Sequence, residues 1–170
     1  MPELIPEFTP RPSLRGGHKM TLYGWGNPRY FPRLPAPTPR YFDVEADARV
    51  LAHCHWQPRP WEHPTILLLH GNAESSAVWF GWVPHLARRY RVVRADMRGF
   101  GDSTPMKRDF AWTLDVVIDD YVCLMDHLGI ERFHLVGAKI GGTIARAFAA
   151  RRQSRMMTLT LIGTPTPFRP

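Results

Sequence analysis

The sequence lacks the features that mark membrane and exported proteins. Its 170 residues contain no run of about eighteen apolar residues, the length that a membrane-spanning helix requires. The first residues also do not combine a basic segment with an apolar stretch, as a secretory signal peptide does. We therefore expect a cytoplasmic protein with no membrane partner.

Cysteine is scarce, and its placement argues against a metal centre or a disulfide framework. The two cysteines, Cys54 and Cys123, lie in separate apolar segments without metal-ligand spacing. We expect both to be buried free thiols, with no metal ion and no cofactor. His53 and His55 flank Cys54 and leave a metal site as an alternative. Strand alternation would place the thiol and the two histidines on opposite faces, which favours a polar strand face.

The charge balance also fails to identify a nucleic-acid-binding protein. The formal net charge is +7, but the lysines and arginines are scattered and form no basic stripe with interleaved aromatic residues. The pairs Arg88-Arg89 and Arg151-Arg152 fall late in predicted helices, where cations interact favourably with the helix dipole. We therefore expect a small-molecule substrate or ligand and no nucleic acid.

Proline divides the chain into two regions. Residues 1–40 hold more than half of the 17 prolines, which exclude regular helix and central strand. We predict a proline-rich arm here, and its aromatic residues indicate that it lies across the folded body. Residues 41–170 alternate short apolar runs with amphipathic segments, a pattern typical of strands joined by crossover helices.

The second region predicts an α/β fold with a doubly wound, mostly parallel sheet and helices on both faces. Strands are expected at 41–45, 50–56, 65–70, 91–95, 133–136 and 157–162. Helices are expected after Ser76, after Thr113 and from about Gly141 to Arg151, with Ser76 and Thr113 as N-caps. The nearly continuous apolar run at 65–70 predicts a central strand buried on both faces. Ligands of such sheets bind at the carboxyl ends of the strands.

Two loops at these carboxyl ends predict the border of a pocket. After the strand at 65–70, Gly71 permits a tight turn, and the N–H group of Asn72 can point at an anion or a developing oxyanion. His70 is expected to hold this loop by hydrogen bonding rather than to transfer protons. The loop at 96–103 lacks the glycine spacing of a dinucleotide or phosphate site and is interpreted as structural. The predicted pocket-lining residues are His70, Gly71, Ala73 and Phe100.

The third loop, GAKIGG at residues 137–142, joins a predicted strand to a predicted helix. In a nucleophile elbow, small flanking residues allow a turn so tight that the central side chain stands exposed above the sheet. The central residue here is Lys139. We predict that its amine projects from the turn at the N-terminus of the helix.

In this order, from about Tyr41 to the end, the segments resemble the N-terminal half of an α/β-hydrolase fold. The stretch at 69–79 looks like the haloalkane dehalogenase and epoxide hydrolase branch. The resemblance implies hydrolysis of ester-like or related small substrates, with an oxyanion hole formed by the N–H groups of Asn72 and Ile140. Two departures affect the implied activity. Lys139 stands where the family has Ser, Asp or Cys, and no histidine follows His134 to complete a triad.

A lysine at the elbow leaves several functions open. An amine that attacked an ester would form a stable amide, which disfavours covalent ester hydrolysis. A neutral amine can form a Schiff base with a carbonyl compound, which predicts a lyase. A protonated Lys139 can instead bind a substrate carboxylate. An inert Lys139 predicts a non-catalytic binding protein or a truncated pseudo-enzyme, which we favour for this chain alone. The open apolar strand at 157–162 predicts self-association or a partner chain.

Overall fold

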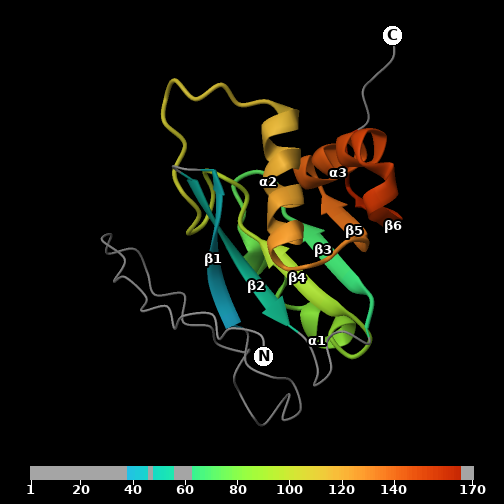
Figure 1. Cartoon of the computed structure of the whole chain (residues 1–170). Helices are drawn as coiled ribbons and strands as arrows, with labels where there is room; N and C mark the ends of the chain where they lie inside the picture. The colour runs from blue at the N-terminus through green and yellow to red at the C-terminus, as the bar shows by residue number, and fades with distance from the viewer. Residues whose placement is uncertain (1–37, 46–47, 56–62, 166–170) are drawn as a thin grey trace.

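The computed structural model describes residues 38–45, 48–55 and 63–165, which form one six-stranded sheet with flanking helices (Figure 1). The strands are β1 (Thr38–Glu45), β2 (Ala48–His55), β3 (Thr65–Leu69), β4 (Arg91–Ala95), β5 (Phe133–Ala138) and β6 (Met156–Ile162), in the order β1-β2-β4-β3-β5-β6. Strand β2 is antiparallel to β1 and β4, and the pairs β3–β4, β3–β5 and β5–β6 are parallel. The predicted fold class is confirmed. Of the predicted arm, residues 1–37 lie outside the described residues, and residues 38–40 belong to β1.

Strand β3 is central, as its apolar sequence predicts. All five of its side chains are buried, and it pairs in register with β4 on one side and β5 on the other. Leu69 at its end is level with Ala95 of β4 and Gly137 of β5. The loops after these three strands therefore leave the sheet at the same edge.

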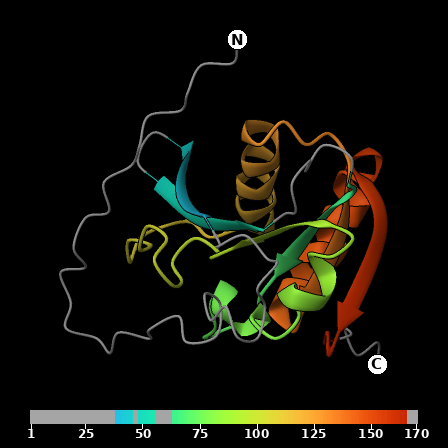
Figure 2. The same ribbon diagram turned by 90° about the horizontal axis from the view of Figure 1, so that it is seen from below.

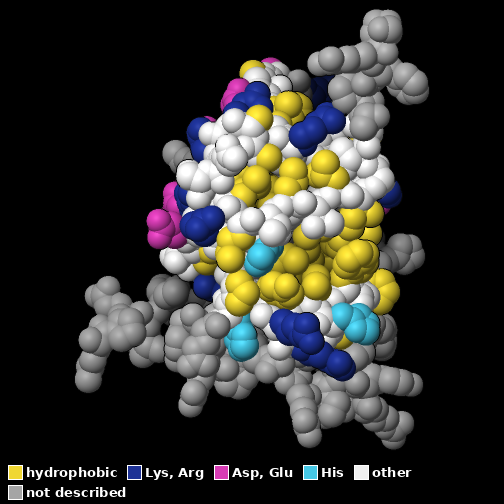
Figure 3. Space-filling model, turned by 90° about the vertical axis from the view of Figure 1, so that its right-hand side faces the viewer, with side chains coloured by type: hydrophobic (Ala, Val, Ile, Leu, Met, Phe, Trp, Pro, Cys, Tyr) yellow, Lys and Arg dark blue, Asp and Glu magenta, His cyan; other side chains and the backbone are white. Residues whose placement is uncertain are grey.

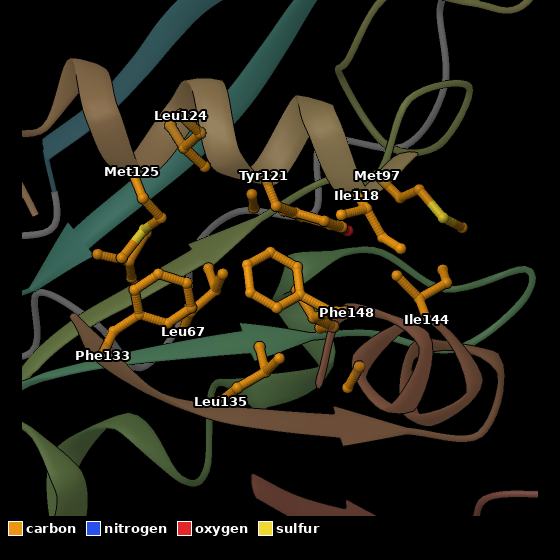
Figure 4. Close-up of a cluster of buried hydrophobic side chains, with 14 of the residues drawn as sticks. Leu67, Met97, Ile118, Tyr121, Leu124, Met125, Phe133, Leu135, Ile144 and Phe148 are labelled. Carbon is orange, nitrogen blue, oxygen red and sulfur yellow. The ribbon is translucent and has the colours of Figure 1, made fainter. Parts of the chain in front are cut away.

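Helices cover both faces of the sheet, which confirms the doubly wound arrangement. Helices α2 (Leu114–His127) and α3 (Ile140–Arg151) lie on one face, and the short elements η2 (Ser76–Trp79) and α1 (Val83–Leu86) lie on the other (Figure 2). Side chains of β3 alternate between the two cores: Leu67 packs with Tyr121 and Phe148 (Figure 4), whereas Leu68 packs with Trp79. One further short element, η3 (Gln153–Arg155), precedes β6.

One helix begins where the sequence predicts, and one does not. The hydroxyl of Thr113 accepts a hydrogen bond from the N–H of Val116, so Thr113 is the N-cap of α2. The helix predicted after Ser76 is instead split into η2 and α1, and the cap of η2 is Ser75. A physical reason is Pro84 near the start of α1, because proline has no N–H group to continue a helix from the preceding turn. Among the described residues, no helix has the length and apolar character to cross a membrane.

A buried ion pair ties the loop after β4 to helix α2. Arg98 donates from Nε and Nη2 to the two carboxylate oxygens of Asp120, at 2.8 and 2.5 Å, and both side chains are buried. The Arg98 guanidinium also lies 5.0 Å from the centre of the Phe110 ring. A bidentate pair of this kind fixes both partners in orientation as well as in distance.

Asp96 and Ser103 brace the same loop internally. The Asp96 carboxylate accepts the N–H groups of Ser76 and Asp102, at 2.6 and 3.0 Å. The Ser103 hydroxyl donates to the Asp96 carbonyl and accepts the N–H of Leu51. These bonds connect β2, the loop and η2, as expected for the structural loop predicted at 96–103.

Removing the buried carboxylate is expected to destabilise the protein strongly. Asp120→Asn leaves the buried Arg98 guanidinium without that negative partner, and we expect the free energy of unfolding to fall by about 3–5 kcal/mol. The neighbouring change Asp119→Asn is the control, because Asp119 pairs with Arg152 on the surface at 3.0 Å. We expect it to cost about 0–1 kcal/mol. Urea unfolding followed by circular dichroism measures both values, and equal small losses would contradict the structural role of the pair.

Candidate functional site

Lys139 occupies a sharp turn between β5 and α3. Its φ of 53° and ψ of −120° lie in a region that side-chain-bearing residues rarely adopt. Its N–H donates to the carbonyl of Ile162 at 2.9 Å, and its own carbonyl accepts the N–H groups of Gly142 and Thr143. Holding a non-glycine residue in such a conformation costs on the order of 1–3 kcal/mol, and strain of this kind concentrates at functional sites.

Glycines on both sides make the turn possible. A Cβ atom placed on Gly137 would lie 2.7 Å from the Cα of Gly142. One placed on Gly141 would lie 2.6 Å from the carbonyl oxygen of Leu69. Both separations are too short for real carbon atoms, so the first turn of α3 packs directly on the ends of β3 and β5.

The turn meets the loop after β3 through an ion pair. The ammonium of Lys139 contacts one carboxylate oxygen of Glu74, and the other oxygen accepts the N–H of Gly71 at 2.9 Å. A Cβ atom on Gly71 would lie 2.8 Å from Cδ of Lys139, so the two loops are in close contact. The Lys139 side chain is 63% exposed and that of Glu74 is 19% exposed. The first and third predicted loops therefore converge on this pair.

The electrostatics of the pair keep the Glu74 carboxyl ionised. The hydrogen bond from Lys139 is the main cause that lowers the pKa of Glu74, and the Gly71 N–H acts in the same direction. Glu74 was not singled out in the sequence. The available signal was an acidic residue in the loop that faces the Lys139 turn, but a contact across 65 positions has no sequence pattern of its own.

His70 holds the loop after β3, as predicted. Its Nε2 atom accepts the N–H of Met97 at 2.8 Å, so its Nδ1 atom carries the proton and donates to the Gly71 carbonyl at 2.8 Å. The ring also meets Phe100 edge-on, with 5.7 Å between centroids. Burial lowers the pKa of His70, which favours the neutral ring. Both nitrogens serve structure, so His70 is not available as a base.

The predicted oxyanion donors and the remaining lining residues lie around this meeting point. Asn72 and Ala73 are exposed and lie in the same loop as Glu74, the residue that contacts Lys139. Ala73 has a φ of 56°. Ile140 is the first residue of α3, where backbone N–H groups have no acceptor within the helix. Phe100 is half-buried and packs against the main core. The roles of Asn72 and Ile140 as oxyanion donors stay predictions.

His134 and His53 lie outside this arrangement. His134, near the start of β5, has its Nδ1 atom 2.8 Å from the Thr158 hydroxyl, at the opposite end of the strand from Lys139. In β2, burial and the nearby Arg94 lower the pKa of His53 to about 4. Across the described parts of the chain, no three potential metal ligands form a cluster. The side chains of Cys54 and His55 lie outside the described residues.

Cys123 is less buried than predicted. Cys123 is half-buried on the side of α2, because it lies beside the helix face that packs into the core and is not part of that face. Partial burial nevertheless raises the pKa of the thiol. This thiol is therefore poorly suited to nucleophilic chemistry.

A surface depression of about 310 Å³ lies far from the Lys139 turn. It is lined by Asp126, Gly129, Ile130, Glu131 and Arg155, at the amino ends of β5 and β6. The Arg155 guanidinium contacts Asp126 at 2.6 Å and the Glu131 carbonyl at 2.7 Å. Because ligands of parallel sheets bind at the carboxyl ends of the strands, we take the converging loops, and not this depression, as the candidate site.

The chain matches the family model described as alpha/beta hydrolase fold over residues 64–170, and it belongs to that family. The 2-hydroxymuconate semialdehyde hydrolase of Pseudomonas sp. (strain CF600) is 37% identical over 102 residues, covering 58% of this chain and 36% of that protein. Epoxide hydrolase 3 of Xenopus tropicalis is 34% identical over 108 residues, covering 62% of this chain and 29% of that protein. The solved structure of a hydrolase from Pseudomonas aeruginosa PA01 matches with a TM-score of 0.70 at 26% identity, and the match covers 80% of this chain and 49% of that one. The chain thus spans about a third of the length of these two curated relatives.

The ion pair predicts an altered titration of Glu74. The carboxyl of Glu74, followed by carbon-detected NMR, is expected to titrate below its ordinary pKa, and Lys139→Met is expected to return it toward that value. Lys139→Arg keeps the positive charge and serves as the control. Because the pKa is lowered in the folded protein, the pair stabilises it above the ordinary carboxyl pKa, and this contribution is lost as the pH falls through the lowered pKa. An unchanged Glu74 titration in Lys139→Met would refute the pairing.

Proposed function

We propose that Lys139 stands at the nucleophile-elbow position of a hydrolase-like pocket and binds a small anionic substrate or ligand there without forming a covalent bond. The observation that carries this proposal is the contact between the Lys139 ammonium and the Glu74 carboxylate. A carboxylate already lies against this amine. A ligand carboxylate, or an oxyanion, is chemically equivalent and would take the place of Glu74.

The backbone around Lys139 supports the same role. The N-terminus of α3 carries a partial positive charge and donors that lack helical acceptors, so negative charge is favoured beside it. The N–H group of Ile140 belongs to this first turn, and that of Asn72 is the proposed second donor from the facing loop. Together with the ammonium they form the proposed oxyanion hole, which would be strongest for charge that develops in a transition state.

The proposed activity of the whole protein is hydrolysis of an ester-like or related small substrate. Two of its relatives are named as hydrolases, one of them as an epoxide hydrolase, and this supports hydrolysis at the level of the family. For this chain alone we propose binding without turnover. Both ring nitrogens of His70 are engaged, His134 lies at the other end of β5, and the sequence has no later histidine.

The proposed domain organisation rests on the family match and the composition. Because residues 38–40 belong to β1, residues 38–170 would form the N-terminal half of an α/β-hydrolase domain, and residues 1–37 would be an appended arm. The family match from residue 64 and the proline content before residue 41 support this division. The cytoplasm remains the proposed location.

Anion binding is testable with butyrate as a simple carboxylate probe. In an NMR titration we expect butyrate to shift the backbone amides of Asn72 and Ile140. Lys139→Met should weaken binding by about tenfold or more, because a charge-assisted hydrogen bond is lost. Glu74→Gln should strengthen binding, because the internal carboxylate no longer competes.

Two controls accompany this titration. Butyramide has the same shape without the charge and should not bind, and Lys107→Met removes a lysine outside the proposed site. Butyrate binding that is equal in Lys139→Met and in the unaltered protein would overturn the proposal.

The alternative of a Schiff-base lyase predicts a different outcome. An ammonium paired with Glu74 has no lone pair to attack a carbonyl, so we expect pyruvate followed by borohydride to leave Lys139 no more modified than the control residue Lys107. Peptide mass mapping measures both residues in the same sample. A strong preference for an adduct on Lys139 would favour the lyase.

A further inference from the structure

His70 joins two loops through the two nitrogens of one ring. Its Nδ1 atom donates to the carbonyl of Gly71, in the loop after β3, and its Nε2 atom accepts the N–H of Met97, in the loop after β4, both at 2.8 Å. Other histidines of this chain reach the surface (cyan in Figure 3), whereas His70 is 1% exposed. The buried ring cannot turn without breaking these bonds, so it fixes the Gly71 carbonyl relative to the loop after β4.

The direction of the Gly71 carbonyl determines where the next N–H group points. This carbonyl and the N–H of Asn72 belong to one peptide unit, which is planar and trans, so the two bonds point to opposite sides. Because the His70 ring holds the oxygen, the N–H of Asn72 points away from the ring. Among the described residues this N–H donates to no backbone carbonyl, and Asn72 is exposed, so the donor can meet a ligand.

The preceding peptide unit is held as well. The N–H of Gly71 donates to the Glu74 carboxylate at 2.9 Å, so each of the two peptide units that meet at the Gly71 Cα atom has one fixed bond. Glycine has more backbone freedom to lose than any other residue. A stiffer residue does not fit here, because a Cβ atom would lie 2.6 Å from Oε2 of Glu74. The side chains of His70 and Glu74 therefore supply the order that the Gly71 backbone lacks.

The loop after β4 is a firm anchor for the ring. Met97 is 3% exposed and lies between two residues with buried polar partners. Asp96 accepts two backbone N–H groups, and Arg98 forms the bidentate pair with Asp120 of α2. The ring is thus tied, through Met97, to the part of the loop that the ion pair holds on α2.

We propose that His70 is a positioning residue, which aims the N–H of Asn72 at a bound oxyanion by holding the carbonyl of Gly71. This inference rests on the proposed role of Asn72 as an oxyanion donor. A donor that is already directed at the anion needs no reorganisation when negative charge develops, which is the source of its effect. The role requires a neutral ring with its proton on Nδ1, because Nε2 must accept a hydrogen bond.

The position of the ring proton tests the proposal without any substitution. NMR of the ring nitrogens distinguishes the protonated atom from the unprotonated one, and we expect the proton of His70 on Nδ1. We also expect a scalar coupling between the Met97 nitrogen and Nε2 across their hydrogen bond. A proton on Nε2, or the absence of this coupling, would overturn the proposal.

Two substitutions separate the two bonds of the ring. Asparagine places an amide N–H near the position of Nδ1, and glutamine places an amide oxygen near that of Nε2. His70→Asn can therefore still donate to Gly71, whereas His70→Gln can still accept from Met97. Each variant loses one bond, so a merely structural role of His70 would affect both alike. In residual dipolar couplings, we expect the N–H of Asn72 to keep its direction in His70→Asn and to change it in His70→Gln.

Butyrate binding connects this direction with the proposed function. We expect His70→Gln to weaken binding by about tenfold and His70→Asn by less than about threefold, because only the first misdirects a hydrogen bond to a charged group. Equal weakening in the two variants, or unchanged Asn72 couplings in His70→Gln, would reject the positioning role, and loss of binding in Lys139→Met would still support the proposed function. If the unaltered protein did not bind butyrate, the proposed function would fail, and the couplings would still decide whether His70 directs this N–H.

Discussion

The close packing of α3 against the ends of β3 and β5 is the constraint on which the candidate site depends. The helix begins one residue after the turn at Lys139, so there is no loop to absorb the change of direction. Glycine at positions 137 and 141 gives the space, and the backbone of Lys139 takes up the remaining bend. The tight turn is thus built from both the glycine spacing and the rare backbone conformation of Lys139.

This packing determines how the loop after β3 and the turn after β5 lie relative to one another. Parallel, in-register strands bring the ends of β3 and β5 to the same level, and the short turns leave little freedom to the residues after each strand. Glu74 and Lys139 meet there, and Glu74 also bonds to the backbone of its own loop. The position of His70 is fixed in the same way by bonds on either side. Glu74 and His70 therefore each make polar contacts in two directions.

The sequence predicted the features that depend on local pattern. The apolar run of β3, the cap at Thr113 and the glycine-flanked turn at Lys139 each have a short-range signature, and each was found in the structure. The prediction of one continuous helix after Ser76 was wrong, because Pro84 interrupts the helix and the spacing of apolar residues does not reveal that effect. The partners of Arg98 and Lys139 could not be predicted, because ion pairs between distant segments depend on three-dimensional packing.

The conformation of Lys139 has a consequence for how this site relates to an active hydrolase. The main chain already adopts the rare geometry, so exchanging the long cationic side chain for a serine would present a hydroxyl group without any rebuilding of the scaffold. The same exchange would leave Glu74 facing that hydroxyl with no counter-ion. The environment of Glu74, rather than the bend itself, is thus what depends on the charge of residue 139.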